Sequence, residues 1–131
     1  MRVKDKKGNL LAIVKRFQDI NQEREFLTEN KYEMQFASFD LPSGINIKRH
    51  IHNIQKRTVH NTTEAIVVLE GEIKISLYSE DDRSFVSSIV LYKGDSILML
   101  YGGHEIDVLN DSKLVEFKQG PYDEAIDKEL F

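Results

Sequence analysis

The segment His50-Ile51-His52 has the spacing of a metal-binding pair. Residues two apart on a strand point to the same face of a sheet, so both imidazoles can bind one ion. The same spacing also fits two histidines on a solvated strand, because Ile45, Ile47 and Ile51 occupy the alternate positions. The pattern therefore allows two interpretations of His50 and His52: a metal-binding pair or a solvated pair.

Two further residues carry chemistry at the start of apolar strands. Glu64 opens the run that ends at Gly71, and a carboxylate without a role would be costly among such neighbours. His104 follows a glycine turn and shares strand parity with Ile106 and Val108, which predicts that its imidazole points inward. The alternatives are an exposed carboxylate at a strand start and a hydrogen-bonded histidine beside a turn.

The elements that must position these residues are strands. Alternating apolar residues separated by turn residues predict an all-β fold, with at most a short helical turn between residues 19 and 29. The expected strands cover residues 10–17, 32–39, 44–52, 64–69, 72–78, 86–92, 96–101, 104–109 and 113–118.

Length and composition limit the classes of function. The 131 residues match one domain, 1–131, and no linker or repeat divides them. A net charge of −4 lacks the positive field that nucleic acid or an anionic membrane requires, so we expect small molecules or other proteins as partners. The absence of cysteine excludes a thiolate metal site and a cysteine nucleophile. No signal-peptide core or membrane span is apparent, and a cytoplasmic location is expected.

Residues 48–110 resemble the cupin superfamily, whose motifs are His-x-His with a following Glu and Gly, and a later Gly-rich segment ending in His. The resemblance implies a jelly-roll barrel, a double-stranded β-helix, here with extra N-terminal strands. It also implies that His50, His52, Glu64 and His104 are the ligands of a divalent metal ion; Zn, Fe, Mn and Ni all accept such donors. The gap between His52 and Glu64 is longer than usual, and an alternative register places Thr58 and His60 at the histidine positions.

A narrower resemblance rests on Lys118-Gln119-Gly120-Pro121-Tyr122 and on Arg49 to His52. It is to small bacterial cupins whose genes lie among those for surface-polysaccharide and nucleotide-sugar synthesis, and it favours the His50 and His52 register. It implies a sugar-like or nucleotide-sugar substrate and isomerase or epimerase chemistry. Metal-free sugar-nucleotide ketoisomerases of the same fold imply instead that His50 or His52 acts as a base. A binding protein without catalysis is the third alternative.

We expect basic side chains to contact the ligand and apolar strands to join two copies of the chain. Arg57 and Lys118 would meet an anionic group of the ligand, with the ligand entering between residues 53–63 and 118–122. Tyr122 either contacts the ligand or fixes the C-terminal segment. The apolar stretches 10–17 and 32–39 exceed what a barrel of this length covers, which predicts a homodimer joined through the N-terminal strands.

Overall fold

Eight β-strands and one short 3-10 helix form the regular structure in this computed structural model, which describes residues 1–131. The all-β prediction is confirmed. The elements in chain order are β1 (Arg2–Lys4), β2 (Leu10–Lys15), η1 (Phe17–Asp19), β3 (Glu25–Phe26), β4 (Ala37–Ser38), β5 (Glu64–Tyr78), β6 (Phe85–Tyr92), β7 (Ser96–Met99) and β8 (Gly103–Lys118). None of the helical structure approaches the length and apolarity of a membrane span.

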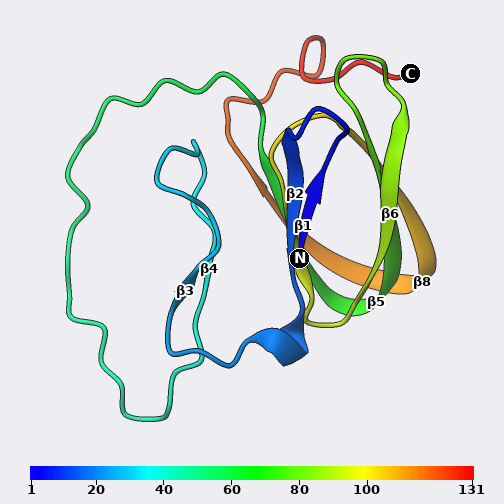
Figure 1. Ribbon diagram of the computed structural model, residues 1–131. Helices are drawn as coiled ribbons and strands as arrows, with labels where there is room; N and C mark the ends of the chain where they lie inside the picture. Colours follow the sequence, from blue (N-terminus) through cyan, green and yellow to red (C-terminus); the bar gives the residue numbers. More distant parts are fainter.

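The long strands β5 and β8 organise the main sheet. They run antiparallel along their full length, from Glu64 opposite Lys118 to Tyr78 opposite Gly103. The first part of β5 also pairs with β7, which continues through β2 to β1, whereas the second part pairs with β6. The sheet bends where β5 changes neighbours, so its two halves enclose the core (Figure 1).

The core lies between the two halves of this bent sheet. Its 13 buried residues include Ile66, Ile75 and Leu91, each at most 1% exposed. A smaller cluster covers the other face of the β2 and β7 layer, where Ile13 and Leu98 pack beneath side chains of residues 27–36. The strand β2 is therefore buried on both faces, and its apolar surface is covered within the chain itself.

Several expected strands differ from the observed ones. The stretch 32–39 contributes only β4, because Tyr32, Met34 and Phe36 pack as irregular chain over the small cluster. The expected breaks near Gly71 and Asn110 are not strand ends: β5 and β8 continue through them with three register shifts between Val68 and Ile73. The possible helix at 19–29 is replaced by η1 and β3.

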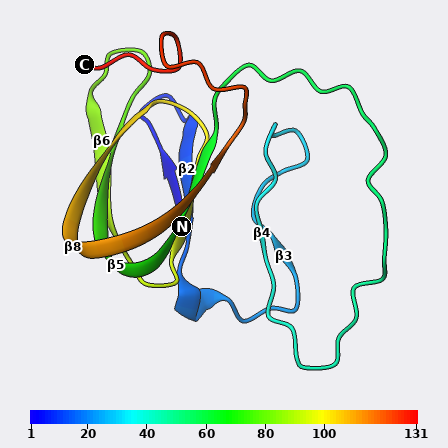
Figure 2. The ribbon, with the colours of Figure 1, turned by 180° about the vertical axis from the view of Figure 1, so that it is seen from behind.

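The expected strand at 44–52 is wrong. Residues 41–62, which we call the arm, contain no strand, and every one of them is exposed. In Figures 1 and 2 the arm loops far out from the sheets, beyond the β3–β4 hairpin. A strand requires a hydrogen-bonded neighbour, and the arm has none in the chain. The main sheet correspondingly remains open, with free edges at β1, β6 and β8.

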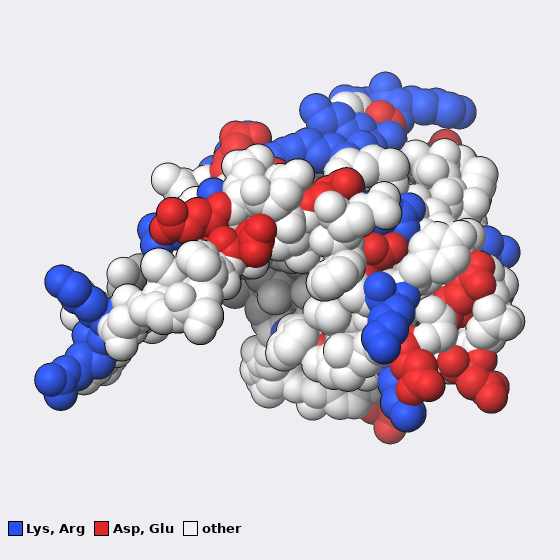
Figure 3. Space-filling model, turned by 90° about the horizontal axis from the view of Figure 1, so that it is seen from below, with Lys and Arg blue, Asp and Glu red and all other residues white.

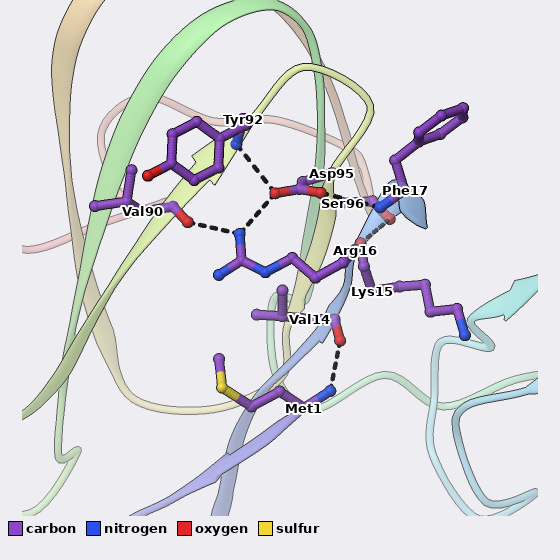
Figure 4. A network of polar contacts seen from close by, with 9 residues as sticks. All are labelled: Met1, Val14, Lys15, Arg16, Phe17, Val90, Tyr92, Asp95 and Ser96. Carbon is purple, nitrogen blue, oxygen red and sulfur yellow. Dashed lines mark hydrogen bonds and ion pairs between the residues drawn. The ribbon is translucent and has the colours of Figure 1, made fainter. Parts of the chain in front are cut away.

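A partly buried ion pair joins the end of β2 to the turn before β7 (Figure 4). The Asp95 carboxylate accepts hydrogen bonds from Arg16 at 2.6 Å, from the Phe17 N–H at 3.0 Å and from the Tyr92 N–H at 3.1 Å. Arg16 also donates to the Val90 carbonyl at 2.6 Å. Burial raises the pKa of Asp95, but the Phe17 N–H and Arg16 outweigh it, so the pKa lies below its usual 3.8.

Substituting Asp95→Asn should therefore lower the free energy of unfolding at pH 7 by about 2 kcal/mol, because charge-assisted hydrogen bonds are lost. A group with a depressed folded-state pKa contributes stability above its unfolded pKa and loses it as the pH falls through the folded value. The difference between wild type and Asp95→Asn should thus be full above about pH 4 and shrink below it. Urea unfolding at pH 7 and pH 3 measures this, and an equal difference at both values would contradict it.

Candidate functional site

Glu64 is the first residue of β5 and His104 is the second residue of β8. Their side chains lie close together, although the two positions are 40 residues apart in the sequence. The His104 Nε2 lies 3.6 Å from the Glu64 Oε1. Their side chains are 30% and 13% exposed, so the pair is mostly but not fully withdrawn from solvent. Ile106, on the same face of β8 as His104, packs against the main core, in line with the inward parity inferred for His104.

The environment keeps Glu64 ionised. Its interaction with His104 lowers the pKa of the carboxyl below 4.5; burial acts in the opposite direction, while the charges of Lys118 and Lys128 add to the lowering. A mostly buried carboxylate that stays charged beside an imidazole can bind a cation or orient the imidazole for proton transfer.

The pair opens into a pocket of about 620 Å³, which is large enough for a small-molecule ligand. Its walls come from the start of β8, the β5–β6 turn, the end of the arm and the C-terminal segment. The polar and charged lining residues include His60, Asn61, Glu64, Glu80, Arg83, Tyr101, His104, Glu116, Lys118, Asp127, Lys128 and Glu129. The pocket thus lies between residues 60–62 and the C-terminal segment, close to where the sequence predicted ligand entry.

The C-terminal segment is fixed by polar contacts around the expected Lys-Gln-Gly-Pro-Tyr run. Gln119 accepts a hydrogen bond from the Thr63 N–H at 2.8 Å and donates one to the Thr63 hydroxyl. Lys118 lies 3.4 Å from Asp127 and 3.5 Å from Glu116, and its ammonium is 5.0 Å from the centroid of the Tyr122 ring. Tyr122 thus packs against Lys118, in line with the reading in which it fixes this segment.

The charge on Lys118 is already matched by carboxylates. Burial lowers the pKa of Lys118, but Glu116 and Asp127 outweigh it and raise the pKa overall. Lys118 would have to exchange these partners to bind an anionic ligand, so a ligand contact from it competes with existing ion pairs.

His50, His52 and Arg57 lie on the arm, outside this pocket. The two imidazole rings stand edge to face with centroids 5.1 Å apart, and the His50 Nδ1 contacts the Lys48 carbonyl at 2.8 Å. Arg57 donates only to Gln55, at 3.4 Å. Within one chain, no group of three or more histidine and carboxylate side chains is close enough to hold a metal. The chain therefore brings together Glu64 and His104, and leaves His50 and His52 away from them.

His60, which belongs to the alternative register, lines the pocket in this chain. The His60 Nδ1 is 2.7 Å from a Glu33 carboxylate oxygen, and the backbone N–H of His60 also donates to that carboxylate. Hydrogen bonding from His60 lowers the pKa of Glu33. His60 thus serves to fasten the end of the arm to the body.

Sequence reasoning missed the part that Arg83 and Phe131 play at the pocket. Arg83 pairs with Glu129 at 2.9 Å, and its guanidinium lies 5.3 Å from the centroid of the Phe131 ring. That ring also packs edge to face on Tyr78 and rests against Gly103, where a Cβ would come within 2.6 Å of it. Arg83 has a positive φ of 56°, which is typical of a tight turn. A turn in the sequence does not indicate that the Arg83 side chain contacts Glu129 and Phe131.

The donors at the site fit a divalent ion. Two ligands bound at roughly 2.0–2.1 Å in tetrahedral geometry lie roughly 3.3 Å apart, close to the 3.6 Å between Glu64 and His104. Imidazole nitrogen and carboxylate oxygen suit Zn, Mn, Fe and Ni alike. Two protein ligands are fewer than a stable site requires, so Glu64 and His104 alone would supply half of a four-ligand set.

Comparison with known proteins adds no relative: no family model, no curated protein and no solved structure matches this chain.

Proposed function

We propose that the protein is a metal-binding cupin that acts on a small, sugar-like substrate, with isomerase or epimerase chemistry. The observation that supports it is the Glu64–His104 pair, held 3.6 Å apart at a pocket of about 620 Å³. His50 and His52 supply the remaining ligands in this proposal. The strand order of the main sheet also suits a jelly roll that lacks one strand beside β8.

A divalent ion at such a site would polarise a carbonyl or hydroxyl oxygen of the substrate. The chain's own residues would do the rest. Glu64 and His104 orient each other, the carboxylate remains charged, and Tyr101 and the acidic and basic residues of the pocket wall offer hydrogen bonds to hydroxyl groups. The C-terminal segment, from Asp127 to Phe131, shields one side of the pocket from water.

A metal-free reaction is the second candidate, and the same pair favours it. A carboxylate that contacts an imidazole fixes the tautomer and position of that ring, which is the arrangement of a general base. In this form His104 moves a proton at a carbon next to a carbonyl, and Glu64 stabilises the charged imidazole. A histidine of the arm would take this part in the ketoisomerase-like alternative drawn from the sequence.

The substrate class follows from charge. Lys118 has carboxylate partners, whereas Arg57 on the arm has only the Gln55 amide. Arg57 lies outside the pocket of its own chain, so it meets a ligand there only where an arm is brought to the pocket. A nucleotide-sugar or sugar acid would then find in Arg57 a bidentate donor for its phosphate or carboxylate.

Elemental analysis of the purified protein, followed by calorimetry with nucleotide-sugars and sugar acids, tests this proposal. We expect bound divalent metal and a ligand whose affinity falls about 10-fold or more in Arg57→Ala, the loss of a charge-assisted hydrogen bond. A catalytic protein would also convert the bound sugar, which nuclear magnetic resonance detects. Metal-free protein that converts a sugar supports the second candidate, and ligand binding without conversion supports a binding protein.

A further inference from the structure

The outer edge of β8 is the largest uncovered feature of the sheet. β8 pairs only with β5, which leaves the other edge of its 16 residues without a neighbour. None of those residues is buried. Val108 lies opposite Ile73, whose side chain is fully buried, yet Val108 itself is 61% exposed. A long edge with apolar side chains and free backbone groups is a template for another strand.

The arm, in turn, has backbone groups and apolar side chains that find no partner in the rest of the chain. Between residues 46 and 59 its hydrogen bonds are local, as from Arg57 to Gln55. Its isoleucines are exposed, among them Ile47 at 64% and Ile51 at 93%. A stretch of this length without structure of its own is uncommon in a folded domain, and so many exposed isoleucines mark a contact surface. Ile45, Ile47 and Ile51 alternate with polar residues, as they would in a strand of a sheet.

Charge and length match the arm to the edge. The arm carries Lys48, Arg49, Lys56 and Arg57 and no carboxylate, and Figure 3 shows Lys and Arg side chains on the part that projects from the body. β8 carries four carboxylates and two lysines. As an extended strand, residues 45–52 would span roughly 26 Å, which is the length of the edge from Gly103 to Asn110.

The arm's attachments direct it away from its own β8. The Asp40 N–H donates to the Gln22 carbonyl at 2.9 Å just before the arm, and the Glu33 carboxylate accepts hydrogen bonds from the backbone N–H groups of His60 and Asn61 near the end of the arm. Both anchors lie in the segment that carries the β3–β4 hairpin, and in Figures 1 and 2 this hairpin stands between the arm and the main sheet. To reach its own β8 the arm would have to pass around the hairpin, whereas a second copy could approach it directly.

We propose that the β8 edge is covered by the arm of a second copy of this chain, and that two copies exchange arms symmetrically. Residues 45–52 become an added strand antiparallel to Gly103–Asn110, with Ile45 and Ile47 on the face of Ile106 and Val108, where they lose their exposure to water. A β-bulge at Lys48 and Arg49, where the alternation of apolar and polar residues breaks, turns the next residues to the other face. In this arrangement His50 and His52 of one copy lie on the face of His104, beside Glu64 and His104 of the other. This last step rests on the metal site of the proposed function, whereas the exchange of arms does not.

The assembly differs from the one expected from sequence. The surface of β2 that suggested a dimer through N-terminal strands is buried inside the chain. Exposed apolar side chains are present on the arm and β8, and of the stretches that predicted the N-terminal dimer only Phe17 and Phe39 remain exposed as large hydrophobic residues.

Light scattering tests the exchange without reference to metal. Wild type at micromolar concentration should have twice the 15.2 kDa mass of one chain. A variant carrying Ile45→Ser, Ile47→Ser and Ile51→Ser should have the mass of one chain, while Ile126→Ser, a control at an exposed residue outside the arm, should remain a dimer. A wild type with the mass of one chain, or an arm variant that stays a dimer, would overturn the proposal.

Mixed dimers test whether the site is shared. One chain carries His50→Ala and His52→Ala, the other Glu64→Gln and His104→Ala, and the two are co-expressed with different tags. Exchange of arms gives each mixed dimer one complete site, so it should bind one zinc ion where either parent binds none. Mixed dimers without zinc, from a wild type that binds zinc, would show that the arm serves its own chain. If wild type binds no zinc, the proposed function fails, and the masses alone decide the exchange.

Discussion

Replacing Glu64 by glutamine is expected to weaken the binding of zinc by on the order of 100-fold, about 2.7 kcal/mol. Glu64 is the only carboxylate within 4.0 Å of His104, and glutamine keeps its size while removing the charge that attracts the ion. His104→Ala should weaken binding to a similar degree, because it removes the neighbouring nitrogen. Calorimetric titration of metal-stripped protein with zinc measures both.

The matched control for this prediction is Glu116→Gln. Glu116 lines the same pocket, but its carboxylate faces Lys118 at 3.5 Å rather than His104. Its substitution should change zinc affinity by less than about 3-fold, the effect of one exposed charge. Equal losses in Glu64→Gln and Glu116→Gln would show that the pocket attracts zinc only by its overall charge.

Replacing Gly71 by alanine is expected to lower the free energy of unfolding by about 3 kcal/mol, the combined cost of a left-handed backbone and a steric clash. Gly71 has a φ of 87° at the place where β5 and β8 shift register. A Cβ there would lie 2.2 Å from the Asp111 carbonyl oxygen and 2.7 Å from the Ser112 Cα. Since the contacts include backbone, the two strands would have to separate.

Gly8→Ala separates the two contributions. Gly8 has the same φ of 87°, but nothing lies within 4 Å of the position of its Cβ. Its substitution should cost only the backbone strain, about 1 kcal/mol. Urea unfolding followed by circular dichroism measures both variants. If they lose equal stability, the close approach of β5 and β8 at Gly71 has no energetic weight.

The strands that the sequence predicted well are those that find their partner within the chain. Ile73, Ile75 and Leu77 alternate with polar residues, and all three are buried, with side chains at most 1% exposed. The pattern could not predict that β5 and β8 run unbroken through Gly71 and Asn110, because a glycine followed by charged residues serves a bulge as readily as a turn.

Residues 44–52 show the limit of such patterns. Their apolar and polar residues alternate as in a strand. Alternation indicates which face of a strand avoids water, but it does not indicate which segment supplies the neighbouring strand. In this chain the neighbour is absent, so the segment forms no strand and is exposed. The same gap explains why the sequence placed His50 and His52 beside Glu64, whereas the single chain does not.

The strand-start positions of Glu64 and His104 could be anticipated from local signals, whereas their meeting is implied only by the cupin resemblance. Glu64 begins an apolar strand and His104 follows a glycine turn, and both features survive in the structure. The contacts of Arg83 with Glu129 and Phe131 could not be, since they join a turn to the end of the chain without any periodic pattern.

X-ray absorption spectroscopy of the zinc-loaded protein counts the imidazoles bound to the metal and so tests whether the arm's histidines complete the site. We expect three imidazole nitrogens and one carboxylate oxygen at roughly 2.0–2.2 Å in wild type. In the His50→Ala, His52→Ala variant, loaded at high zinc concentration, we expect a single imidazole. An imidazole count that is the same in wild type and in this variant would show that the arm's histidines do not complete the site formed by Glu64 and His104.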